Sequence, residues 1–143
     1  MKKAKILICY NHKEDKLYKD IMRTWADNSD YEFVVDSRSE TEPFDSSQAV
    51  ALKNALTNKY LGVDSIVVIV GQAPQDEKWM KWEMDMIHKL KVPHAVVRVH
   101  TSFSIPDVLK KNGSIAKSFT PTAVFKAIDQ SLNNKKKAPL GKI

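Results

Sequence analysis

Short apolar runs alternate with amphipathic segments along this chain. Residues 6–9 are four consecutive apolar residues that end abruptly at a polar segment, which is typical of a strand buried on both faces. Residues 13–27 then carry apolar side chains at the spacing of a helix face: Leu17, Ile21 and Trp25, with Tyr18 and Met22 beside them. The pattern predicts a strand followed by a helix that packs through this face.

The same alternation continues through the middle of the chain. Residues 31–35 form a second predicted strand, and residues 36–46 are a polar loop that contains Pro43. Ser46 or Ser47 caps a predicted helix that runs to about Tyr60, with three side chains facing inward: Leu52, Ala55 and Leu56. Residues 65–70 are the most hydrophobic strand, so we expect them at the centre of a parallel sheet.

The second half of the chain repeats this order. Gly71 ends the central strand, Asp76 is the predicted N-cap, and residues 77–90 form a helix. The remaining predicted elements are a strand at 94–99, a short helix at 105–112, a weak edge strand at 114–118 and a closing helix at 121–133. We therefore expect one α/β domain, residues 1–134, and a basic tail, residues 135–143. Its fold is predicted to be flavodoxin-like with three layers and a parallel sheet of four to five strands in the order 2-1-3-4-5.

Composition supports one folded domain. The chain has 143 residues, of which 43% are hydrophobic and 28% charged. Its net charge of +6 depends strongly on lysines near the C-terminus, and the three arginines are scattered, which argues against a nucleic-acid partner. The single cysteine, Cys9, excludes an internal disulfide, and the apolar run after the first lysines is too short for a signal peptide or a membrane span. We expect a cytoplasmic protein with no membrane partner.

Several familiar chemistries do not fit the sequence. The glycines stand at 62, 71, 113 and 141, so neither a G-x-G-x-x-G turn nor a Walker A loop is present. The strand ends lack the acidic residues of a phospho-receiver, because residues 9–11 and 70–72 stand there instead. The four histidines (His12, His88, His94 and His100) have no metal-ligand spacing, so no metal site is predicted.

The predicted topology indicates where a ligand binds. In open parallel sheets, ligands bind beyond the carboxyl ends of the strands at the point where the strand order reverses, here between the first and third strands. Residues 9–12, 36–46 and 71–83 are expected there.

Glu83 breaks the helical pattern of residues 77–90. Trp79, Trp82, Met86 and Leu90 lie on one side of this helix, and Glu83 falls among them. No basic residue lies three or four positions away, and burying a carboxylate is costly unless another group compensates. Glu83 therefore faces a ligand crevice, pairs with a basic residue of another element, or projects from the edge of the stripe into water; spacing leaves these alternatives open.

Four segments together resemble the TIR-like domains of prokaryotic antiviral systems, including the TIR-like subunit of Thoeris defence. They are residues 5–10, 12–15, 35–37 and, above all, 79–83, where Trp79 and Glu83 have the Trp-x-x-x-Glu spacing of TIR-type NAD-consuming enzymes. The resemblance extends to about residue 130. Cys9 stands where many relatives have serine.

This resemblance implies that NAD is a substrate and that no cofactor is needed. The bond between nicotinamide and ribose would break, and ADP-ribose would pass to water, to itself as a cyclic product, or to another acceptor. The nicotinamide ring is cationic in NAD and becomes neutral when it leaves, so the leaving group needs no proton. One carboxylate therefore suffices, and the resemblance assigns this role to Glu83. It also implies self-association and a separate effector protein that senses the product. The implied substrate-binding residues are Cys9, Tyr10, Asn11, Asp36, Ser37, Gln72 and Trp79, with Tyr10 or Trp79 stacking on a substrate ring.

Two alternatives remain open at this stage. Many TIR folds act as non-catalytic assembly modules, in which Glu83 would be structural. A nucleoside deoxyribosyltransferase has a related topology and also uses a glutamate against an anomeric carbon, although the first strand end lacks that family's small residues.

Overall fold

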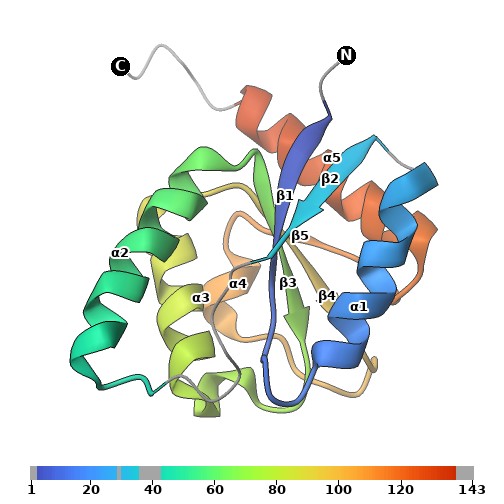
Figure 1. Ribbon diagram of the computed structural model, residues 1–143. Helices are drawn as coiled ribbons and strands as arrows, with labels where there is room; N and C mark the ends of the chain where they lie inside the picture. Colours follow the sequence, from blue (N-terminus) through green and yellow to red (C-terminus); the bar gives the residue numbers. More distant parts are fainter. Residues whose placement is uncertain (1–2, 29, 36–42, 138–143) are drawn as a thin grey trace.

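A computed structural model describes residues 3–28, 30–35 and 43–137. Its centre is a five-stranded parallel sheet in the order β2-β1-β3-β4-β5, as predicted (Figure 1). The strands are β1 (Ala4–Cys9), β2 (Tyr31–Val34), β3 (Ser65–Val70), β4 (His94–Arg98) and β5 (Ser114–Ile115). The fold is an α/β flavodoxin-like fold.

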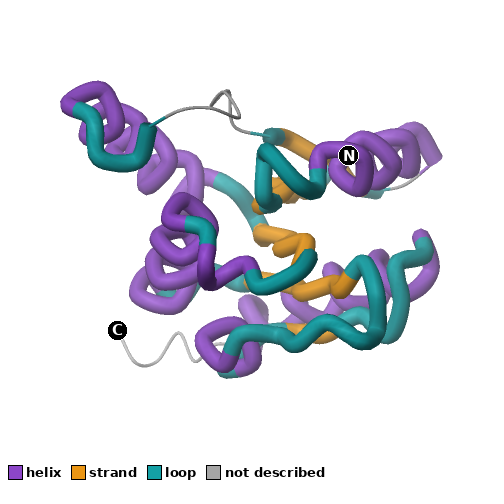
Figure 2. The backbone as a smooth tube through the Cα atoms, turned by 90° about the horizontal axis from the view of Figure 1, so that it is seen from below, coloured by secondary structure: helices purple, strands orange, loops and turns teal. Residues whose placement is uncertain are grey.

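Helices cover both faces of the sheet, which gives three layers (Figures 1 and 2). The helices α1 (Lys16–Thr24) and α5 (Pro121–Lys137) pack on one face; α2 (Ser47–Gly62), α3 (Lys78–Leu90) and α4 (Asp107–Lys110) pack on the other. Short 3₁₀ helices at Trp25–Asn28 and Pro74–Asp76 follow α1 and precede α3. No helix in these described ranges has the length and apolar character to cross a membrane.

The central strand β3 connects the two hydrophobic cores. All six of its residues are buried. Val68 and Val70 face the core under α2 and α3, whereas Val67 and Ile69 face the core under α1 and α5. This explains why a continuous apolar run was a reliable signal for the central strand.

Two predicted helix faces were partly wrong. Leu17 and Ile21 of α1 are exposed, with relative accessibilities of 65% and 37%, and the helix instead packs through its neighbouring face, with Met22 fully buried. On α2, Ala55 is exposed, and Ala49 is buried together with the predicted Leu56. Apolar spacing fixed the helical period, but adjacent apolar stripes left the rotation of each helix ambiguous.

Two helix ends also differ from the prediction. The N-cap of α3 is Glu77, whose side chain accepts a hydrogen bond from the Met80 N–H at 2.6 Å. Asp76 does not cap this helix because it lies in the preceding 3₁₀ turn, and the backbone becomes extended only at Glu77. At the other end of the chain, α5 continues through residues 135–137, which the sequence assigned to the tail; the remainder of that tail lies outside the described residues.

Candidate functional site

A cavity of about 720 Å³ lies beyond the carboxyl ends of β1, β3 and β4. The loop after β1 contributes Asn11, and the loop after β3 contributes Gln72. The cavity lies at the predicted switch point, and two of the predicted binding residues line it. We call this space the crevice cavity.

Asn11 shapes the loop that forms one wall of the crevice cavity. Its side-chain oxygen accepts hydrogen bonds from the N–H groups of Lys13 and Glu14, at 3.0 and 3.1 Å. Its backbone carbonyl accepts a third hydrogen bond, from the Asp15 N–H at 2.8 Å. These bonds turn the chain from β1 into α1 and hold Asp15 at the entry to the helix.

Asp15 also lines this cavity, and sequence reasoning did not single it out. Its side chain is 7% exposed and rests on Gly71: a Cβ at that glycine would be 2.4 Å from the Asp15 Oδ2 atom. A side chain at position 71 would therefore force the Asp15 carboxylate to move. Burial, and then the neighbouring charge of Glu14, raise the pKa of Asp15 above its usual range.

Glu83 lies on the inner face of α3, and only 1% of its side chain is exposed. The Tyr60 hydroxyl of α2 donates a hydrogen bond to its Oε1 atom at 2.9 Å. The Cys9 thiol at the end of β1 lies 3.5 Å from its Oε2 atom. The prediction that an acid lies within the apolar face of this helix is confirmed, since Met80 and Met84 beside it are also buried.

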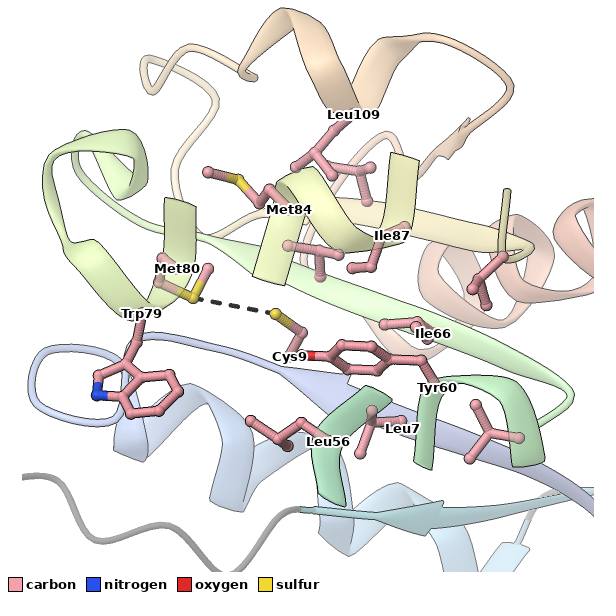
Figure 3. Packing of buried hydrophobic residues seen from close by; sticks show 14 of the residues in the cluster. Leu7, Cys9, Leu56, Tyr60, Ile66, Trp79, Met80, Met84, Ile87 and Leu109 are labelled. Carbon is pink, nitrogen blue, oxygen red and sulfur yellow. Dashed lines mark hydrogen bonds between the residues drawn. The ribbon is translucent and has the colours of Figure 1, made fainter. Parts of the chain in front are cut away.

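Three elements meet at this carboxylate. Figure 3 shows the Tyr60 hydroxyl reaching from α2 toward Cys9, with the Met80 thioether on the other side, 4.0 Å from the cysteine sulfur. The hydroxyl and the thiol both offer a hydrogen to the carboxylate, which offsets part of the cost of burying it. We refer to Cys9, Tyr60 and Glu83 as the Glu83 cluster.

Aromatic rings pack beside the Glu83 cluster at the start of α3. Trp79 is 3% exposed and meets the ring of Phe44 edge-on at a centroid distance of 5.1 Å. The Lys53 ammonium lies 3.7 Å from the centroid of Phe44 and 5.8 Å from that of Trp79. A substrate ring would stack on Trp79 only if Phe44 moved.

The structure separates the predicted site residues into groups. Cys9, Trp79 and Glu83 lie in the core on the α2–α3 face, whereas Tyr10 belongs to the core on the opposite face. The Tyr10 ring stacks on His12, with centroids 4.2 Å apart. Asn11 and Gln72 line the crevice cavity, of which Glu83 is not a lining residue. The predicted Asp36 and Ser37 lie outside the described residues.

Tyr60 was missed as a site residue. From the sequence alone, this tyrosine only marks the end of a helix. The feature that could have identified it is its position four residues after Leu56, which puts its hydroxyl on the buried face of that helix. A buried tyrosine hydroxyl needs a hydrogen-bonding partner, but the sequence does not show which element supplies it.

The chain is an α/β protein of flavodoxin-like topology, and it has a glutamate, Glu83, buried on α3. Residues 7–104 match the family model described as Thoeris protein ThsB, TIR-like domain, and the chain belongs to this family. It is thus a TIR-like protein related to antiviral defence. No curated protein has a sequence that matches this chain.

Solved structures of distant proteins share the fold. One is a conserved protein from Enterococcus faecalis V583, with a TM-score of 0.58 and 13% identity over 90% of this chain and 98% of that chain. Another is a 2-deoxyribosyltransferase from Bacillus psychrosaccharolyticus, with a TM-score of 0.57 and 14% identity over 97% of this chain and 95% of that chain. At these identities the likeness concerns the fold alone.

Proposed function

We propose that this chain is an NAD-consuming enzyme that cleaves the nicotinamide–ribose bond at the Glu83 cluster. The observation that carries the proposal is the buried Glu83 carboxylate, which a hydroxyl and a thiol from two other elements face at 2.9 and 3.5 Å. A carboxylate fixed in a low-dielectric site stabilises a developing cation more strongly than one in water. Membership of the TIR-like family supports the choice of NAD as the substrate.

The proposed reaction needs one carboxylate. The bond between the ribose C1′ and the nicotinamide nitrogen breaks, and its electron pair leaves with nicotinamide, which becomes neutral. The ribose carbon becomes oxocarbenium-like, and the negative charge of Glu83 stabilises it. Water or another nucleophile then adds to C1′ and loses a proton, which yields ADP-ribose or an ADP-ribose-derived product. No general acid is required for the leaving group.

Tyr60 and Cys9 have supporting roles in this proposal. The Tyr60 hydrogen bond orients the Oε1 atom of Glu83, which leaves the second oxygen, near the thiol, to approach the substrate. Because Glu83 is 1% exposed, NAD reaches it only after neighbouring side chains such as the ring of Trp79 move aside. Other parts of NAD are proposed to contact Asn11 and Gln72 of the crevice cavity, together with Asp36 and Ser37.

Product release from NAD tests this proposal. Purified protein is incubated with NAD at several protein concentrations, and nicotinamide and the ADP-ribose products are quantified by mass spectrometry. We expect Glu83→Gln to lower the rate by about 100-fold or more, the loss typical of removing one preorganised electrostatic group. Asp85→Asn, an exposed acid on the same helix paired with Lys81, is the matched control and should leave the rate unchanged.

The same assay separates the alternatives. Absence of nicotinamide release at every protein concentration, and in extracts of infected cells, would favour a non-catalytic assembly module. Exchange of bases between deoxynucleosides, without turnover of NAD, would instead favour a deoxyribosyltransferase. We also propose that the active form self-associates and that a separate effector protein senses the product, so activity should rise more than linearly with protein concentration.

A further inference from the structure

Lys53 of α2 is a charged side chain that the proposed reaction does not use. It is half-buried, and its ammonium lies 3.7 Å from the centroid of the Phe44 ring and 5.8 Å from that of Trp79. In the part of the chain that the structure describes, no carboxylate forms an ion pair with this ammonium. Aromatic faces beside the Glu83 cluster therefore hold a positive charge that no described acid neutralises.

The other lysines of α2 and of the start of α3 contact oxygen atoms. Lys59 donates a hydrogen bond to a backbone carbonyl at 3.1 Å, and Lys78 and Lys81 form ion pairs at 3.1 and 3.0 Å. A hydrogen bond between an ammonium and a charged oxygen is stronger than the contact of an ammonium with a partly exposed ring. Lys53 is therefore the lysine of this set that moves to an anionic ligand at the lowest cost.

Lys53 and Tyr60 lie on the same side of α2, because seven residues make about two helical turns. The Tyr60 hydroxyl donates to Glu83 at 2.9 Å, and Lys53 precedes Tyr60 by about 10 Å along the helix axis. Since α2 begins at the edge of the sheet where the strands end, Lys53 lies between the Glu83 cluster and this edge (Figure 1). In NAD, one ribose separates the diphosphate from the C1′ carbon. A C1′ carbon at Glu83 therefore brings the diphosphate within reach of the long, flexible Lys53 side chain.

We propose that Lys53 leaves the Phe44 ring and binds the diphosphate of NAD when the substrate enters. This inference rests on the proposed function and adds a cation to it, because none of the binding residues named there carries a positive charge. The ammonium supplies the charge opposite to that of the diphosphate and donates charge-assisted hydrogen bonds to its oxygens. Lys53 is thus a binding residue that sets the affinity for NAD and takes no part in breaking the bond to nicotinamide.

Calorimetric titration with ADP-ribose, which contains the diphosphate, tests this contact without turnover of NAD. Lys53→Met keeps the methylene chain against the rings and should weaken ADP-ribose binding about tenfold, the loss of a hydrogen bond to a charged group. Lys53→Arg keeps the charge and should retain most of the binding. Adenosine, which lacks the diphosphate, should bind Lys53→Met and the wild type alike. The matched control is Lys89→Met, at the exposed far end of α3, which should bind ADP-ribose as the wild type does.

Steady-state kinetics give a second readout. Lys53→Met should raise the KM for NAD about tenfold and leave kcat within about twofold, because the ammonium contacts the diphosphate and not the bond that breaks. If Lys53→Met fails to fold, Lys53→Gln replaces it and should show the same losses.

The role of Lys53 would be overturned if the wild type did not bind ADP-ribose, or if Lys53→Met bound it as tightly as the wild type. An equal loss in Lys89→Met, or an equal loss of adenosine binding, would also overturn it. These results leave any nicotinamide release that depends on Glu83 untouched. Conversely, ADP-ribose binding that depends on Lys53, in a protein that does not cleave NAD, would support the diphosphate contact and overturn the proposed reaction.

Discussion

Glu83 is an acidic residue at the centre of a buried helix face, and its neighbours come from distant parts of the sequence. Its position within the apolar stripe was predictable from the residues around it, because helical spacing places it beside Trp79. Its partner Tyr60 was not predictable, since the hydrogen bond depends on how α2 packs against α3. The same holds for Asp15, whose contact with Gly71 joins two loops.

Tyr60→Phe tests whether the hydroxyl positions Glu83. The variant keeps the ring in the core and removes one hydrogen bond, so we expect the kcat of NAD cleavage to fall about 10-fold, from the loss of a hydrogen bond to a charged group. The KM should change little, because the hydroxyl contacts the carboxylate and not the substrate. Steady-state kinetics measure both constants.

Tyr31→Phe is the matched control for this substitution. Tyr31 is also buried and also donates to a carboxylate, that of Asp129, but on the opposite side of the sheet. The Tyr31→Phe variant should have a lower free energy of unfolding than the wild type and an unchanged kcat for NAD cleavage. A fall in kcat of the same size in both variants would mean that Tyr60 acts only through stability.

Helix α3 carries most of the proposed chemistry, so its start fixes the geometry of the site. Sequence reasoning found the helix and its end at Leu90 but placed the N-cap one residue early, because Asp76 and Glu77 are both acids at its entrance. Aspartate is the commoner cap, and only the 3₁₀ turn formed by Pro74–Asp76 shifts the cap to Glu77.

Alanine substitutions at these two positions distinguish the caps. Glu77→Ala should lower the free energy of unfolding by about 1 kcal/mol, the usual cost of losing an N-cap hydrogen bond. Asp76→Ala should stay within about 0.5 kcal/mol of the wild type, as surface substitutions do. Urea denaturation followed by circular dichroism measures both. A larger loss of unfolding free energy in Asp76→Ala than in Glu77→Ala would mean that Asp76 caps the helix in solution.

At the scale of the whole molecule, alternation of apolar runs and amphipathic segments was enough to predict the order of the strands in the sheet. The pattern works because parallel strands buried on both faces are continuously apolar, as in β3. It does not determine long-range polar contacts, such as the one between Tyr31 of β2 and Asp129 of α5, which are 98 residues apart. That contact ties the last helix to the edge of the sheet.

The Tyr31–Asp129 contact predicts how stability depends on pH. Burial, followed by the hydrogen bond and charge of Asp129, raises the pKa of Tyr31 above its ordinary value of 10.0. The folded state thus prefers the neutral phenol. Stability from this preference is complete below pH 10.0 and is lost as pH rises above it, because the unfolded tyrosine ionises first. Thermal melts from pH 8 to 11 should show a steeper loss in the wild type than in Tyr31→Phe. Parallel curves would contradict this role.

The central claim is that NAD reaches the Glu83 carboxylate, and Cys9, the chain's one cysteine, lies 3.5 Å from it as a built-in reporter. The most direct measurement is the rate at which iodoacetamide alkylates Cys9 in the Glu83→Gln variant, with and without NAD, followed by intact-protein mass spectrometry. The account predicts that saturating NAD slows alkylation about tenfold or more, because a ligand that binds only the native site suppresses its exposure. Suppose that the wild type consumes NAD but that NAD does not change the rate of Cys9 alkylation in Glu83→Gln. The reaction would then take place elsewhere, which would contradict the account.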